Sequence, residues 1–166
     1  MVKLNFRITD DIQDYKAVDF MKEWISIYGG VELIVNHQAV GYCPQRELFP
    51  GEEWTEDIWY ALYKLSEGAI CTYDGQEYEI QLLSSNLLTL RMKLEVDLII
   101  SCIHEQGNRV LWCERVEYIE FSTEIKRALD EFLESISQGN KNLLKAKPIQ
   151  EMRERKRELE RILEGI

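Results

Sequence analysis

The sequence predicts an α+β fold in which a mainly antiparallel, twisted sheet of hairpins is packed by two amphipathic helices. The first observation is an alternation over residues 88–104, where every even position from 88 to 102 is apolar and the odd positions from 89 to 97 are polar. A period of two is typical of a strand with one buried face. The second observation is helical spacing of apolar residues at about 55–66 and 123–137. The third is the short turn sequences between neighbouring strand patterns.

The alternating stretch 88–104 is longer than usual strands at about 3.3 Å per residue. We therefore expect a bend or break near Lys93 to Glu95. Its even face, from Leu88 to Cys102 and including Val96, is expected to form the wall on which both helices pack. Its odd face ends in Ile99 and Ile103, which would be a place for a partner if neither helix covers them.

Four strand patterns precede the first helix. Residues 4–8 alternate as a first strand. Residues 15–25 are read as a short helix or turn that leads into a strand at about 23–28, which pairs with 31–36 across the turn Gly29-Gly30. A further short strand is expected at 39–43.

The first helix is expected to begin after the N-cap Thr55 and to end at Gly68. Residues 69–73 and 76–82 then flank Asp74-Gly75, a dipeptide typical of two-residue hairpin turns, and are read as paired strands.

After the long strand, a two-residue turn at Gly107-Asn108 leads into a strand over 110–121. This register places Cys102 opposite Cys113, but it also turns Arg115 and Glu117 toward the core, which a longer loop or a bulge would relieve. The second helix is expected to be capped by Ser122 or Thr123 and to end at Gly139.

Residues 1–140 are thus expected to form a single α+β domain, and residues 141–166 a basic linker with a C-terminal helix at about 148–164. The apolar positions of that helix are sparse. Three placements stay open, which are docking on the body, pairing with a second copy as a homodimer, and fraying.

Charge divides the chain in the same place. Residues 141–166 hold eight basic and five acidic residues, which leaves 12 basic and 25 acidic residues, a net charge of −13, on residues 1–140. An acidic body favours a basic protein partner and disfavours nucleic acid, although acidity also serves solubility alone. No apolar run is long enough to span a membrane and the first residues are too charged for a signal peptide, so we expect a cytoplasmic protein.

The sequence offers little chemistry, and we expect no metal, cofactor or catalytic residue. Four scattered cysteines and two histidines form no metal-binding pattern. Cys102 and His104, two residues apart on one strand, are the nearest approach to a nucleophile and base, and Cys102 with Cys113 to a redox pair. An enzyme whose site is assembled near Cys102 and His104 therefore stays as an alternative.

The best candidate for recognition is the loop from Phe49 to Trp59, because large aromatic side chains among charges are typical of protein-binding hot spots. The candidate residues are Glu52, Glu53, Trp54, Glu56, Asp57 and Trp59. The competing interpretation is a capped helix with an acidic first turn and tryptophans in the core.

In layout, residues 1–140 resemble the small acidic immunity proteins of bacterial polymorphic-toxin and contact-dependent inhibition systems. The resemblance is carried by the opening LNFRITDDIQDY, the segment WISIYGGVELIVN, the loop and helix LFPGEEWTEDIWYALYKL, and an antiparallel meander that closes on an amphipathic helix. It implies a non-enzymatic cytoplasmic protein that binds and blocks one toxin domain, often a basic nuclease. The basic C-terminal extension departs from this layout, and a structural or regulatory subunit that oligomerises through 148–164 is a further alternative.

Overall fold

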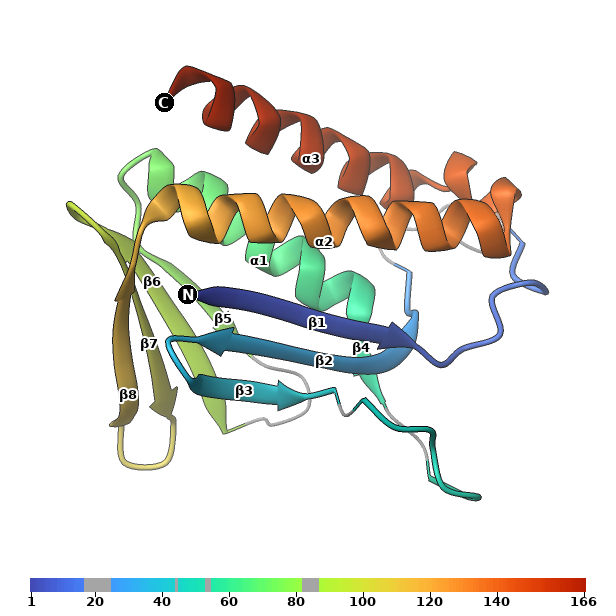
Figure 1. Ribbon diagram of the computed structural model, residues 1–166, viewed down its shortest axis with the longest axis horizontal. Coiled ribbons are helices and arrows are strands. Elements are labelled where there is room, and N and C mark those ends of the chain that lie inside the picture. Colours follow the sequence, from blue (N-terminus) through green and yellow to red (C-terminus); the bar gives the residue numbers. More distant parts are fainter. Residues whose placement is uncertain (17–24, 44, 53–54, 82–86) are drawn as a thin grey trace.

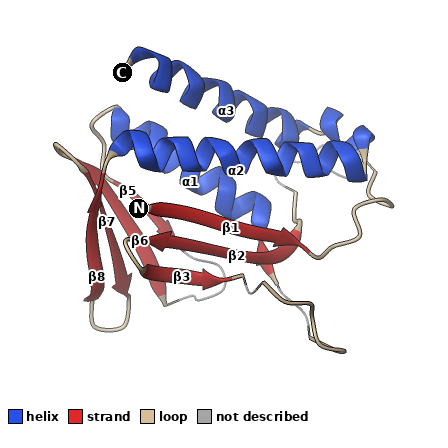
Figure 2. Cartoon of the chain, in the orientation of Figure 1, coloured by secondary structure: helices blue, strands red, loops and turns tan. Residues whose placement is uncertain are grey.

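A computed structural model of the chain, which describes residues 1–16, 25–43, 45–52, 55–81 and 87–166, shows two antiparallel sheets packed by helices (Figures 1 and 2). The predicted α+β class is confirmed. The first sheet contains β1 (Val2–Ile8), β2 (Tyr28–Val35), β3 (Gln38–Tyr42) and the short β4 (Glu56–Asp57). The second contains β5 (Tyr78–Gln81), β6 (Leu88–Leu94), β7 (Leu98–His104) and β8 (Arg109–Val116). The helices are α1 (Ile58–Tyr73), α2 (Tyr118–Gly139) and α3 (Lys147–Gly165), with the 3-10 helix η2 (Lys141–Lys145) between the last two.

Helix α1 lies at the centre of the molecule. It contacts β2 and β4 of the first sheet, β5 and β6 of the second sheet, and both α2 and α3. Figure 1 shows α2 running along β1, with α3 on the side of α2 away from the first sheet. The core is therefore shared by both sheets and all three helices.

The long alternating stretch is two strands, and the expected break is a hairpin. The chain reverses at Glu95–Asp97, so that Leu94 pairs with Leu98 and Leu90 with Cys102. Because this register pairs even positions with even positions, the buried face keeps its phase through the turn. Val96 is the exception, since it stands at the tip of the hairpin and is 95% exposed. Its predicted place on the core face was wrong.

The expected irregularity in the next hairpin is confirmed. Residues 105–108 form a longer loop, and a register shift between Cys102 and Ile103 leaves Leu111 as an extra residue in β8. Cys102 therefore pairs with Trp112 and not with Cys113. The thiol of Cys113 instead accepts a hydrogen bond from the Ser101 hydroxyl at 3.2 Å.

The predicted turn at Gly29-Gly30 was wrong, because both glycines lie inside β2. Gly29 pairs with Ile8, and a β-carbon at Gly29 would lie 1.9 Å from the carbonyl oxygen of Arg7. Glycine is required here for close backbone approach rather than for a turn. The turn that joins β2 to β3 is Asn36-His37, where both residues have the positive φ of a tight two-residue turn. Residues 17–24, which hold most of the expected short helix or turn and the start of the expected strand, lie outside the described residues.

The predicted hairpin at Asp74-Gly75 was also wrong, because α1 continues through Gly68 to Tyr73. Asp57, and not Thr55, is the N-cap, and its carboxylate accepts a hydrogen bond from the Tyr60 N–H at 3.1 Å. Gly75 has a φ of +80° and ends the helix. Residues 69–73 resemble a strand in sequence because this part of the helix is largely buried and lacks a helical period of polarity.

Helix α2 starts at Tyr118, five residues before the predicted start, whereas α3 agrees with the prediction within one residue at each end. Helix α3 docks on the chain's own α1 and α2, and its apolar residues Ile149, Met152 and Leu159 are fully buried.

Helix α2 also covers the edge of β1. The Glu120 and Glu124 carboxylates accept hydrogen bonds from the N–H groups of Val2 and Leu4 at 2.9 and 2.7 Å. The Arg127 guanidinium donates to the carbonyl of Leu4 at 2.7 Å.

A charged network holds α3 on α1. The Glu67 carboxylate accepts from Lys64 at 2.8 Å, from Arg155 of α3 at 3.2 Å, and from the Tyr78 hydroxyl. Burial by itself would raise the pKa of Glu67, but these three donors outweigh it and hold that pKa below its ordinary value.

Gly29→Ala is expected to lower the free energy of unfolding by about 1–3 kcal/mol, because the new methyl group meets backbone that cannot move independently. Urea denaturation measures the change. Gly165→Ala, at a position with open space around it, is the control and should be nearly neutral. A neutral Gly29→Ala would show that β1 and β2 are not in this register.

Glu67→Gln is expected to cost about 1.5–3 kcal/mol at neutral pH, because it removes hydrogen bonds to two charged groups. A lowered folded-state pKa stabilises the fold above the unfolded value of about 4.3, and that stability is lost as the pH falls through the folded value. The difference between wild type and variant should therefore shrink toward zero below about pH 4. Urea denaturation across this range checks it, with the exposed Glu154→Gln as control, and a pH-independent difference would contradict it.

Candidate functional site

Glu52 of the predicted recognition loop holds the loop together. Both of its carboxylate oxygens accept from the Arg46 guanidinium at 2.7 Å, and one also accepts from the Phe49 N–H at 2.9 Å. The guanidinium lies over the Phe49 ring, 4.2 Å from its centre. The charge of Glu52 is thus matched within the loop, while the Phe49 ring is largely exposed.

The remaining candidates of this loop do not form one exposed cluster. Trp59 is 4% exposed, stacks on Tyr63, and donates its indole N–H to the carbonyl of Pro148 at 3.2 Å. Asp57 caps α1, and burial raises the pKa of its carboxyl. Glu56 pairs with Gly29 in β4. Glu53 and Trp54 lie outside the described residues.

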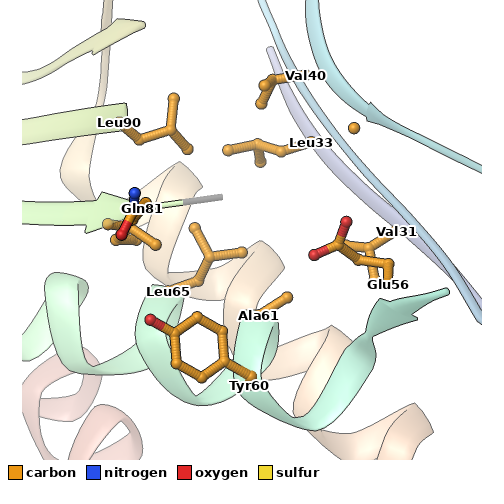
Figure 3. Close-up of a pocket in the computed structure, with 11 residues that line it drawn as sticks. Val31, Leu33, Val40, Glu56, Tyr60, Ala61, Leu65, Gln81 and Leu90 are labelled. Carbon is orange, nitrogen blue, oxygen red and sulfur yellow. The ribbon is translucent and has the colours of Figure 1, made fainter. Parts of the chain in front are cut away.

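Glu56 also lines a pocket between the two sheets (Figure 3). Its other walls are apolar side chains of the first sheet, α1, β5 and β6, together with the Tyr60 and Gln81 side chains. About 30 Å³ of the pocket is open to the centre of a water molecule, which is room for one or two waters. Small-molecule sites are about ten times larger, so the pocket is a narrow seam of the core.

A surface groove elsewhere has the composition of a binding site. It lies where the β6–β7 turn, the start of α2 and the ends of α1 and α3 meet, and Leu94 and Tyr118 line it. Four large apolar side chains in its walls are exposed to solvent. These are Tyr73 (42%), Val96 (95%), Ile119 (48%) and Ile166 (57%). Contiguous exposed apolar surface of this kind marks interaction sites.

Carboxylates rim this groove, which we call the acidic groove. Glu95, Asp97 and Glu117 line it, and Asp74 follows Tyr73 directly. Glu95 forms ion pairs with Lys93 and Arg115 at 3.7 and 3.6 Å. Asp74, Asp97 and Glu117 form no ion pair with any residue that the structure describes.

The sequence interpretation missed the acidic groove because it placed each contributor elsewhere. The sequence pattern predicts strands at Tyr73 and Ile119 and a core position for Val96. The signal present in the sequence was Val96 itself, an apolar residue between Glu95 and Asp97 at the expected break.

Cys102 and His104, the candidates for chemistry, are buried or half-buried, and so are Ile99 and Ile103 on the odd face of the alternating stretch. The Cys102 side chain is 1% exposed, and burial raises the pKa of its thiol, which disfavours the reactive thiolate. His104 lies at the end of β7 with Nδ1 3.3 Å from the carbonyl oxygen of Gln106. Ile103 is only 5% exposed, so it offers no surface to a partner, and Ile99 is half-buried.

Within the described part of the chain, no three histidine, cysteine or acidic side chains are grouped to hold a metal ion. None of the helices described there is both long and apolar enough to cross a bilayer.

Comparison with known proteins adds no assignment: no protein-family model, no curated protein and no solved structure matches the chain.

Proposed function

We propose that the chain is a non-enzymatic protein-binding module of the immunity type, which neutralises a basic toxin domain by holding it at the acidic groove. The observation that carries this proposal is the coincidence of four exposed apolar side chains with a rim of carboxylates, of which Asp97 and Glu117 form no ion pair with a described residue. Exposed aromatic and aliphatic side chains supply the area that a partner buries. The carboxylates select a partner with lysine or arginine around its own apolar contact.

The charge of the whole body supports the same partner. Residues 1–140 carry a net charge of −13. A field of this sign accelerates association with a basic protein and repels phosphate backbones. The immunity class itself comes from the layout resemblance of residues 1–140, and cytoplasmic residence is part of that proposal.

The predicted loop has a smaller place in this proposal than the sequence suggested. Glu52 is bound by Arg46 and Trp59 is packed in the core, so reversing or removing either would disturb the fold as well as the surface. Among the described residues of the loop, the Phe49 ring, which is 65% exposed, is the part that a partner would reach.

The test measures affinity between this chain and the product of the adjacent open reading frame, which this proposal expects to contain a basic toxin domain. Ile119→Lys and Asp97→Lys are each expected to weaken binding by about tenfold, which is about 1.4 kcal/mol. Ile119→Lys removes apolar contact area, and Asp97→Lys reverses a rim charge and slows association. Calorimetry and stopped-flow kinetics separate the two effects.

Glu154→Lys is the matched control. Glu154 is exposed on α3, forms no ion pair with a described residue, and lies about 18 Å along that helix from Ile166. Glu154→Lys therefore makes the same change of charge as Asp97→Lys, at a position away from the groove. Binding that is indifferent to the two groove variants and to rising salt would overturn the proposal.

A further inference from the structure

β1 is an edge strand of the first sheet, so one side of its backbone has no neighbouring strand. Side chains of α2 bond to this edge along the first half of β1 only. In this antiparallel pair, Thr9 donates its N–H to the carbonyl of Tyr28, so the odd residues of β1 face β2 and the even residues point outward. Val2 and Leu4 are the first two outward residues, and Glu120, Glu124 and Arg127 of α2 bind both of their N–H groups and the carbonyl of Leu4, as described above.

The next two outward residues are Phe6 and Ile8. Among the described residues, no side chain or backbone group of α2 bonds to their N–H or carbonyl groups. A crevice separates them from the C-terminal half of α2. It is lined by Phe6, Arg7, Ile8, Glu131, Glu134, Ser135 and Gln138, and we call it the β1 crevice.

The β1 crevice is an open hollow much larger than the seam between the two sheets. About 530 Å³ of it is open to the centre of a water molecule, compared with about 30 Å³ in the seam of Figure 3. Four backbone groups, two donors and two acceptors, face this space at the spacing of a strand edge. Such an edge is the template that an added strand uses.

The helix wall of the β1 crevice is acidic. Glu134 accepts a hydrogen bond from Gln138 at 3.0 Å and has no basic partner in the described part of the chain, whereas Glu131 pairs with Arg127. The base in the lining, Arg7, donates from its guanidinium to the carbonyl of Arg46, in the loop after β3, at 2.6 Å. A bound segment therefore meets carboxylates on one side and open backbone on the other.

We propose that the β1 crevice binds an extended, basic segment of a protein partner, which adds to β1 beside Phe6 and Ile8 as a short strand. Backbone hydrogen bonds to these two residues supply the register, and lysine or arginine side chains on the segment reach Glu134 and Glu131. This surface is separate from the acidic groove, and the inference does not depend on the proposed function.

The test uses the full chain and two peptides, acetyl-KVTVK-amide and the acidic counterpart acetyl-EVTVE-amide. Titration is followed by the backbone amide resonances of the protein. The basic peptide should shift the amides of Phe6 and Ile8 with a dissociation constant of about 1 mM or tighter, and the acidic peptide should bind at least about tenfold more weakly. Basic peptide that leaves both amides unshifted, or that shifts only residues of the acidic groove, would overturn the inference.

Variants separate the two parts of the site. Glu134→Lys should lower the affinity for the basic peptide by about fivefold or more. Glu154→Lys, the same change on α3, should leave that affinity unchanged. Ile8→Pro removes an outward N–H that β2 does not use and should also weaken binding. Ile119→Lys in the acidic groove should leave peptide affinity unchanged. Equal effects of Glu134→Lys and Glu154→Lys would show general charge attraction and would contradict a site at β1.

Discussion

The packing of α1 against both sheets is the constraint on which the rest of the structure depends. The two sheets are separate ladders, and α1 joins them because it contacts strands of each and both other helices. Ten of its sixteen residues are buried, so it has no wide solvent face. Close contact requires small side chains, and at Gly68 a β-carbon would lie 1.9 Å from the Met92 side chain. Helix α3 completes the enclosure, and the ion pair between Arg155 of α3 and Glu67 of α1 holds it there.

This arrangement also determines where binding surface remains. The acidic groove forms where the ends of α1 and α3, the start of α2 and the β6–β7 turn lie near one another, and Tyr73 and Val96 stay exposed there because no described element covers them. The β1 crevice forms because α2 reaches the backbone of β1 along its first half and leaves it open along the second. Both surfaces combine residues that are far apart in the sequence, and both are acidic. The proposed basic partner and the proposed strand addition are therefore compatible on one molecule.

Sequence interpretation succeeded where burial is one-sided and failed where it is not. The alternation of 88–102 predicted the buried face of β6 and β7 correctly, because each strand has one covered face and the hairpin preserves the phase. The amphipathic pattern of 148–164 predicted α3 for the same reason. The strand predicted at 69–73 was wrong because that end of α1 is largely buried and its sequence shows no helical alternation of polar and apolar residues. The turn predicted at Gly29-Gly30 was wrong because a glycine pair is typical both of turns and of close backbone approach. Only the position of the Arg7 carbonyl on the neighbouring strand distinguishes the two.

The sequence by itself determined the α+β class, the two-faced strands, the break near residue 95, the irregularity in β8 and the concentration of negative charge in residues 1–140. These features follow from local periodicity and composition, which each segment carries alone. Only the tertiary structure decided that Trp59 is buried, that Glu52 is bound by Arg46, and that Tyr73, Val96 and Ile119 share one groove. Exposure and proximity depend on what the other elements cover, and that covering is set by the packing of the whole chain around α1.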